Sequence, residues 1–150
     1  MCIRDRAFTL QPMRIDGRSV IFANAFSCND VESFRQLWHR HHPSDHPAAF
    51  LFNARTDRPL RSRAFLALLP QLCPEAALYV TQGSGALRRM AVKAGFDRSR
   101  VHILADGPAQ NHLARIAREI AEGTVIWGTG NFQGAGAEIT VFAKAAARSC

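Results

Sequence analysis

The feature that most constrains the fold is a fivefold alternation between short, uniformly apolar runs and longer stretches with helical periodicity. Apolar runs of four to six residues are typical of strands that are covered on both faces. The predicted strands are Ser19–Ala23, Ala48–Asn53, Ala77–Thr81, Val101–Ala105 and Thr124–Trp127. Because parallel strands need a crossover connection, this order predicts an α/β fold with a mostly parallel sheet and helices on both faces.

The stretches between these strands carry apolar residues at spacings of three and four, as amphipathic helices do. The predicted helices are Asp30–Arg40, Arg61–Leu69, Gly85–Ala94, Pro108–Ala121 and Gly136–Arg148. We expect Asn29 to cap the first helix, with Glu32 reaching back from three residues further on. Phe8–Ile15 precedes an Asp16-Gly17 turn and is expected to add an edge strand or hairpin arm, which gives five to six strands.

Length and composition favour one domain. A chain of 150 residues with 47% hydrophobic content can bury one core of ordinary size. The first six residues, MCIRDR, have no periodicity and resemble a translated sequencing adapter. We therefore expect residues 1–6 to lie outside the natural domain, residues 7–150 to form a single domain, and the natural protein to begin further upstream.

The charge pattern disfavours nucleic-acid binding. The formal net charge is +7, but only two of the 19 basic residues are lysines, Lys93 and Lys144, and the arginines are scattered along the chain. No basic block is interleaved with aromatic residues, as nucleic-acid surfaces often are. We expect an arginine surface that is solvated or faces anions, and no nucleic-acid partner.

Histidine and cysteine residues could form a metal site or a nucleophile, but their positions favour structural roles. His39, His41, His42 and His46 cluster where a helix is expected to end, and histidine there also bonds terminal carbonyl groups, so we expect no metal site. Cys28 has no histidine nearby in sequence to activate it, and we expect a semi-buried thiol. The four cysteines form no C-x-x-C pair, which fits a reducing cytoplasm.

Polar loops follow all five predicted strands. In open parallel sheets, ligands bind at the carboxyl ends of the strands, where such loops gather. The loop NARTDRPLR, which starts at Asn53, continues into a helix and brings four arginines close together in sequence: Arg55, Arg58, Arg61 and Arg63. Guanidinium groups bind carboxylate and phosphate in a bidentate manner, so this loop is a candidate anion site.

The segment VIWGTGNFQGAGAEI raises the alternative of a nucleotide-binding oxidoreductase domain. A dinucleotide fingerprint needs G-x-G-x-x-G between a strand and a helix. Gly128 and Gly130 begin that pattern, but Gln133 occupies the third position and Gly134 comes one residue late. The turn also follows the last strand, whereas the fingerprint usually follows the first. We therefore expect a strand, a turn and a helix start here, and no NAD site.

Three segments together resemble the C-terminal part of the ligase subunit of poly-γ-glutamate synthase (the PgsB/CapB type). The motifs are N-x-F-x-x-N-D at Asn24–Asp30, N-x-R-x-D-R at Asn53–Arg58, and G-x-G-N at Gly128–Asn131 followed by Gly134. The resemblance covers nearly everything after residue 18. That family looks related to Mur ligases and folylpolyglutamate synthetase, which implies a Rossmann-like three-layer sandwich. Ala25–Cys28 departs from the Asp-Tyr-Ala-His of a Mur-type first loop.

The resemblance implies ATP-dependent amide formation between a poly-γ-glutamate chain end and glutamate. The implied substrate- and phosphate-binding residues are Asn24, Asn29, Asp30, Asn53, Arg55, Asp57, Arg58, Gly128, Gly130, Asn131 and Gly134. Within that set we expect Arg55 and Arg58 to clamp anions, Asp57 to orient them, and the glycines to let backbone N–H groups approach an anion.

The sequence contains no G-K-[ST] loop, so we expect ATP and Mg to be bound mainly by an upstream domain and this segment alone to be inactive. No catalytic residue and no metal ligand is assigned within it. The resemblance also implies membrane subunits as partners, and a cytoplasmic location at the inner face of the cell membrane. A scaffold domain without a substrate site is the remaining alternative.

Overall fold

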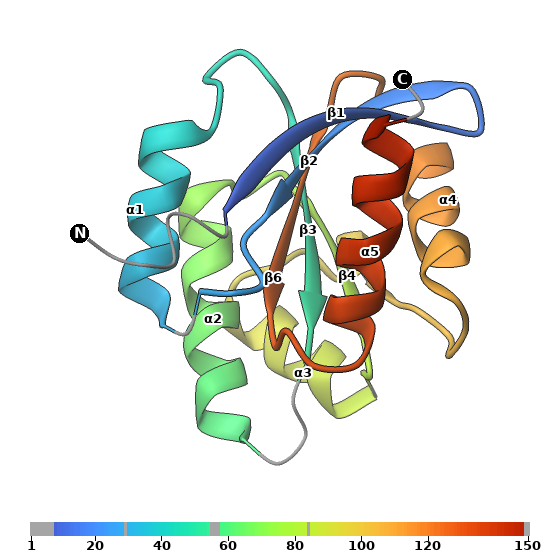
Figure 1. The fold of residues 1–150 in the computed structure, drawn as a ribbon. Coiled ribbons are helices and arrows are strands. Elements are labelled where there is room, and N and C mark those ends of the chain that lie inside the picture. Colours follow the sequence, from blue (N-terminus) through green and yellow to red (C-terminus); the bar gives the residue numbers. More distant parts are fainter. Residues whose placement is uncertain (1–7, 29, 55–57, 84, 149–150) are drawn as a thin grey trace.

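The computed structural model describes residues 8–28, 30–54, 58–83 and 85–148. One six-stranded sheet has the order β1-β2-β6-β3-β4-β5, and only the β1–β2 pair is antiparallel (Figure 1). The strands are β1 (Thr9–Ile15), β2 (Arg18–Asn24), β3 (Ala48–Asn53), β4 (Ala77–Thr81), β5 (Val101–Ile103) and β6 (Val125–Gly130). The helices are α1 (Val31–His41), α2 (Pro59–Leu72), α3 (Gly85–Ala94), α4 (Ala109–Glu119) and α5 (Ala135–Arg148), with a 3-10 turn η2 at Arg98–Arg100.

Helices cover both faces of the sheet, as predicted, which gives a Rossmann-like three-layer sandwich. Figure 1 shows α1 and α2 on one side of the sheet and α4 and α5 on the other. Phe34 of α1 and Phe65 of α2 share a core with Trp127 of β6, and α3 packs on that same face. Leu113 of α4 and Ile139 of α5 belong to the core on the opposite face. No described helix is long and apolar enough to cross a bilayer.

The first two strands form the predicted hairpin. Asp16 and Gly17 connect them with φ values of 51° and 78°, the pair of positive angles that a tight hairpin turn needs. Pro12 lies within β1, opposite Ile21 of β2. Because β1 is an edge strand, the missing N–H of proline interrupts no ladder between two neighbours. The prediction of an edge strand or hairpin arm before the turn is confirmed.

Strand β6 lies between β2 and β3 and extends three residues beyond its predicted end. The sequence pattern places Gly128 and Gly130 in a loop, which is wrong, because they pair with Asn24 and Asn53 respectively. A Cβ atom on Gly128 would lie 2.7 Å from the Phe26 ring. A Cβ atom on Gly130 would lie 2.5 Å from the Asn53 carbonyl oxygen, and its φ is +99°. These glycines therefore let neighbouring segments pack against the end of the strand.

Helix starts differ from the predictions for local reasons. The N-cap of α1 is Asp30, whose Oδ1 accepts a hydrogen bond from the Ser33 amide at 2.8 Å. The predicted cap, Asn29, lies outside the described residues. Helix α2 begins at Pro59, two residues before its predicted start, because proline lacks the N–H that a first helical residue leaves unbonded.

His42 anchors the end of α1 to the core. Its ring stacks on Trp38 with centroids 4.0 Å apart, its Nδ1 accepts from Trp127 Nε1 at 3.1 Å, and its Nε2 lies 3.1 Å from the His46 carbonyl oxygen. Since the indole N–H can only donate, the His42 proton resides on Nε2. His46 Nδ1 lies 2.8 Å from the Gly123 carbonyl oxygen. Both tryptophans are buried, and the described residues contain no metal-ligating group of three His, Cys, Asp or Glu side chains.

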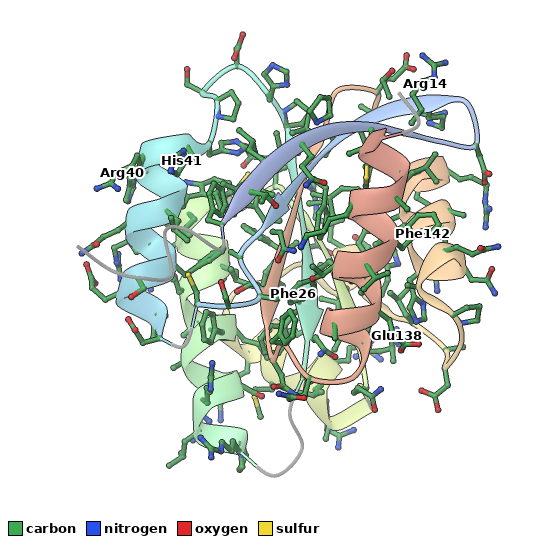
Figure 2. All side chains as sticks on the ribbon, viewed as in Figure 1. Arg14, Phe26, Arg40, His41, Glu138 and Phe142 are labelled. Atoms are coloured by element: carbon green, nitrogen blue, oxygen red, sulfur yellow. The ribbon has the colours of Figure 1, made fainter. Side chains whose placement is uncertain are left out.

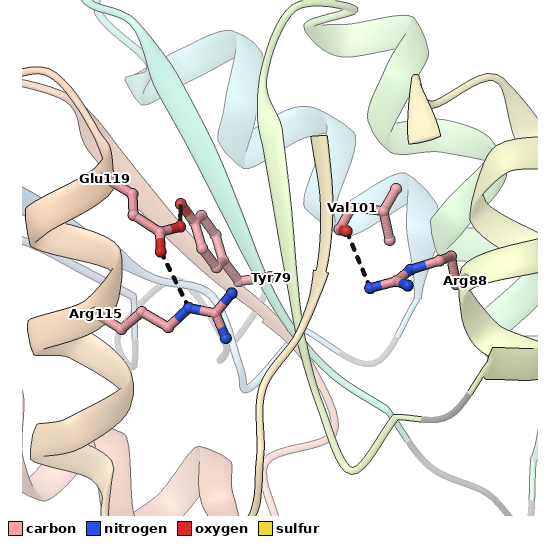
Figure 3. Close-up of polar contacts among 5 residues, drawn as sticks. All are labelled: Tyr79, Arg88, Val101, Arg115 and Glu119. Atoms are coloured by element: carbon pink, nitrogen blue, oxygen red, sulfur yellow. Dashed lines mark hydrogen bonds and ion pairs between the residues drawn. The ribbon is translucent and has the colours of Figure 1, made fainter. Parts of the chain in front are cut away.

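A second polar cluster ties β4 to α4 (Figure 3). The Tyr79 hydroxyl donates to Glu119 Oε1 at 2.9 Å, and Arg115 Nε donates to Glu119 Oε2 at 3.1 Å. Burial and the hydrogen bond to Glu119 raise the pKa of Tyr79, so its phenol remains a donor at neutral pH. In the same view Arg88 Nη2 donates to the Val101 carbonyl oxygen at 3.5 Å, which links α3 to β5.

Alanine substitutions at Gly134 and Gly130 separate the two reasons for a glycine in this region, a positive φ and a close contact with neighbouring backbone. Gly134 also has a positive φ, +65°, but no described atom lies within 4 Å of its added Cβ. We expect Gly134→Ala to cost ~1–2 kcal/mol of unfolding free energy from backbone strain alone. Gly130→Ala adds a clash with the Asn53 backbone and is expected to cost at least ~2 kcal/mol more. Urea unfolding at one pH measures both, and equal losses would contradict the close contact.

Stability is expected to fall on mild acidification. Burial lowers the pKa of His42, His102 and His112, so between their native pKa values and about 6.5 the unfolded chain binds more protons than the native one. The stabilisation is fully present above about pH 6.5 and is lost progressively as the pH falls from that value through the native pKa values. The urea midpoint should therefore drop between about pH 7.5 and about pH 5.5.

Urea midpoints of two histidine variants over the same pH range measure how much His42 contributes to this pH dependence. His42→Asn should lower the midpoint at neutral pH and flatten its pH dependence, while His39→Asn, at an exposed position of α1, should do neither. A midpoint that rises on acidification, or an NMR titration that places the pKa of His42 above 6.5, would overturn this account.

Candidate functional site at the carboxyl edge of the sheet

At the carboxyl ends of β2, β6 and β3, the loops that follow neighbouring strands turn to opposite faces of the sheet. Strands β2 and β3 continue into α1 and α2 on one face, whereas β6, which lies between them, continues into α5 on the other. Loops that diverge from neighbouring parallel strands leave a crevice between them, which is where such sheets bind ligands. All three segments that carry the sequence motifs begin at this point (Figure 1).

Asn53, at the end of β3, binds the loop that follows β6. Its Nδ2 donates to the carbonyl oxygens of Asn131 at 2.6 Å and Gln133 at 2.8 Å, and its backbone carbonyl accepts from the Asn131 amide at 2.8 Å. Thr81 of β4 donates from Oγ1 to Asn53 Oδ1 at 2.6 Å. The buried side chain of Asn53 therefore fixes the loop position across three strands, which leaves its amide no free donor.

Asn24, at the end of β2, fixes the position of α5 in the same way, through hydrogen bonds of its side chain. Its Nδ2 donates to Thr140 Oγ1 at 2.9 Å, and its Oδ1 accepts from the Phe26 amide at 3.2 Å. Phe26 then lies over the end of β6 beside the start of α5, as Figure 2 shows. Its ring is what Gly128 leaves room for, since an added Cβ atom would lie 2.7 Å from it, whereas a Cβ atom on Gly136 would lie 2.5 Å from the Asn131 carbonyl oxygen. The asparagine and phenylalanine of the first motif thus shape the crevice from within.

The glycines of the third motif have different roles. Gly128 is required by ring packing and Gly130 by the Asn53 carbonyl, so neither needs an anion to explain it. Gly134, with a positive φ, precedes α5 and has open space around it. The Asn131 side chain accepts from the Gln133 amide at 3.3 Å, which closes the turn between β6 and α5. Of these residues, Gly134 is the one whose surroundings leave room for a ligand.

Cationic groups approach the crevice from α2. Arg58 is the N-cap residue of this helix, is exposed, and makes no capping bond with its side chain. Arg61 is partly buried, and its Nη2 lies 3.4 Å from the Cys28 carbonyl oxygen. The helix start adds a partial positive charge that favours anions. Arg55 and Asp57, the predicted clamp and its partner, lie outside the described residues, as does Asn29. Asp30 caps α1 and is exposed.

A polar pocket of about 150 Å³ opens at the same edge, beyond β4 and β5. Its lining includes Thr81, Gln82, Asp106, His112 and Glu138. Burial lowers the pKa of His112, although Glu138 and Asp106 oppose this shift. The sequence pattern predicted a polar loop after β5 but singled out none of these side chains. The available signal was the acidic residue that follows the strand, Asp106, one position after Ala105.

Cys28 is buried at 1% exposure and lies in the core beneath α1 and α2, which is deeper than the semi-buried position predicted for it. Near it, a hollow of about 10 Å³ lined by Asn53, Arg61 and Asn131 is too small for a substrate group. The crevice between β3 and β6 is therefore closed by protein contacts, and ligand space lies at its rim.

Comparison with known proteins identifies the family. No curated protein matches the chain. The family model described as the poly-gamma-glutamate synthase CapB C-terminal domain matches residues 10–145, which include all six strands but for the first residue of β1. The matched region also contains the three motif segments and the crevice that they form. The chain therefore belongs to the poly-gamma-glutamate synthase CapB C-terminal domain family.

Proposed function

We propose that this domain binds the acidic substrates of an ATP-dependent ligase that joins glutamate residues through γ-amide bonds. The observation that carries the proposal is the meeting of three motif segments around β6, with the cationic start of α2 at their rim. Both substrates bring carboxylates, and one carboxylate becomes an acyl phosphate during the reaction. Guanidinium groups and a helix N-terminus stabilise such charges without any change in structure during the reaction.

The chemistry proceeds in two steps. A γ-carboxylate oxygen of the chain end attacks the terminal phosphorus of ATP, so that an acyl phosphate forms and ADP leaves. The amine of the incoming glutamate then attacks the acyl carbon, the C–N bond forms, the C–O bond to phosphate breaks, and phosphate departs with the bonding electrons. The amine loses a proton to solvent or to a base. Arg58 and Arg61, with Arg55 from the adjoining loop, are proposed to hold the carboxylates and phosphoryl oxygens.

The residues for ATP itself are proposed to lie in another part of the synthase. The 150 residues contain no G-K-[ST] sequence. We infer that ATP and Mg are bound by that other part and that this segment alone forms no amide bond. A relation to Mur ligases, a peripheral position at the membrane and contact with membrane subunits belong to the same proposal.

The polar pocket beside β5 suits the ammonium group of the incoming glutamate. Asp106 and Glu138 line it, and carboxylates are the partners that an ammonium group needs. His112 in its wall is neutral at neutral pH because its pKa is lowered by burial. The arginine rim and this acidic pocket lie at the same edge of the sheet, the rim at the start of α2 and the pocket beside α4 and α5.

Replacement of Arg58 tests the anion site. In the complete synthase, Arg58→Ala should lower kcat/KM for glutamate incorporation ~10–100-fold, because a charge-assisted hydrogen bond contributes ~1.5–3 kcal/mol. Arg98→Ala, at an exposed position of η2 that precedes β5, removes the same charge at the opposite edge of the sheet and should leave the rate unchanged. Unchanged rates for both variants would favour a scaffold without a substrate site.

Replacement of Glu138 tests the ammonium pocket. Glu138→Gln in the complete synthase should raise KM for glutamate ~10-fold or more, with KM for the acceptor chain unchanged. Asp45→Asn, at an exposed position in the loop after α1, is the matched control and should change neither constant. If Glu138→Gln raised both KM values equally, the pocket would not discriminate the incoming amine.

A further inference from the structure

A wide groove runs between α2 and α3 on the surface of the domain. Its volume is about 460 Å³, and its lining combines small or apolar side chains with three cations. The apolar members include Ala67, Ala86 and Met90, and the cations are Arg63, Arg89 and Lys93. Its described lining residues all come from α2 and α3, so it is distinct from the crevice and from the acidic pocket.

The three cations have no acidic partner among the described residues. Arg63, Arg89 and Lys93 are exposed, the described lining of the groove contains no carboxylate, and none of them forms an ion pair with any part of the chain that the structure describes. Elsewhere on the surface, by contrast, Arg115 pairs with Glu119 at 3.1 Å. The groove thus presents a concentrated positive field that an external anion can neutralise.

The groove begins where the crevice ends. Helices α2 and α3 both start at the carboxyl edge of the sheet, after β3 and β4, and run back toward the opposite edge. Ala86 lies near the start of α3 and Lys93 near its end, a rise of ~10 Å along the helix. A chain bound at the start of α2 therefore has a continuous cationic path away from the site.

We propose that this groove binds the growing poly-γ-glutamate chain and guides it away from the site of bond formation. This inference rests on the proposed function, because the polymer is the product of that reaction. One occupant fits the groove best: an extended polycarboxylate with apolar segments between its charges.

The repeat length of the polymer matches the spacing of the cations. An α-peptide rises ~3.3–3.6 Å over three backbone bonds, so a γ-linked glutamyl unit, with five, extends ~6 Å. Arg89 and Lys93 are four residues apart on α3, which corresponds to a rise of ~6 Å on one helix face. Successive α-carboxylates of the extended polymer can therefore meet successive cations.

The apolar lining favours this polymer over a nucleic acid. Each γ-glutamyl unit carries two backbone methylene groups, which can pack on Ala67 and Met90. Single-stranded nucleic acids bind through bases stacked on aromatic side chains, and no described aromatic residue lines the groove. Charge alone attracts either polyanion, but the lining complements only the polycarboxylate.

Binding by the 150-residue chain tests the proposal directly. Fluorescently labelled poly-γ-glutamate is titrated by anisotropy at low and physiological salt, with labelled α-linked polyglutamate and single-stranded DNA of equal charge as comparison probes. The groove variant carries Arg63→Gln, Arg89→Gln and Lys93→Gln. The control variant carries Arg98→Gln, Arg100→Gln and Lys144→Gln, which removes the same three charges at exposed positions outside the groove.

We expect the groove variant to bind poly-γ-glutamate at least tenfold more weakly and the control variant to change affinity less than twofold. Affinity for poly-γ-glutamate should also exceed that for both comparison probes at physiological salt, where general charge attraction is screened. Equal weakening in the two variants, no measurable binding, or tighter binding of DNA through the same three residues would each overturn the proposal. Unchanged thermal unfolding of both variants confirms that the comparison is between folded proteins.

A second readout separates this inference from the proposed function. In the complete synthase a variant with only the two α3 substitutions, Arg89→Gln and Lys93→Gln, should keep its rate with a short acceptor and produce shorter polymers. If Arg58→Ala leaves bond formation intact while the groove variant still loses polymer affinity, the proposed function fails and the groove remains a binding surface. If Arg58→Ala abolishes activity while the groove variant binds polymer normally, only the groove proposal fails.

Discussion

The position of β6 between β2 and β3 is the constraint on which the rest of the structure depends. It is the last strand in sequence, and it forms parallel ladders on both sides. Its Trp127 lies in the core beneath α1 and α2 and fixes His42 by a hydrogen bond. Its end lies between the two loops that turn to the opposite face. The core and the crevice therefore share one strand, and a change in its register would disturb both.

The carboxyl edge is organised by small residues and amides before any ligand is considered. Gly128 and Gly130 allow Phe26 and the Asn53 backbone to approach β6, and the asparagines Asn24 and Asn53 fasten α5 and the following loop. These asparagines and glycines look like binding residues in the sequence, but in the structure they hold the segments around the site in position. The charged groups proposed to meet substrate, among them Arg58 and Glu138, lie around these residues at positions exposed to solvent.

The sequence predicted the architecture well because its signals are local and repeated. Apolar runs, amphipathic periods and the Asp16-Gly17 turn each report on neighbouring residues, so the strands, the hairpin and the two helix layers followed. The extension of β6 through Gly130 did not follow, since glycine disfavours strands locally and only contacts with distant segments explain it. The acidic pocket was missed for the same reason: Asp106 follows β5 and Glu138 follows β6, and these strands, which β3 and β4 separate, are placed relative to each other only by the complete sheet.

The central insertion of β6 also has a consequence during synthesis. Strand β6 is synthesised after the other five strands, so the nascent polypeptide first exposes the facing edges of β2 and β3 with their backbone groups unpaired. Contacts between segments so far apart form slowly, which lengthens the period of exposure. Ribosome stalling or cleavage before Gly130 would leave a two-sided gap that invites strand exchange between molecules.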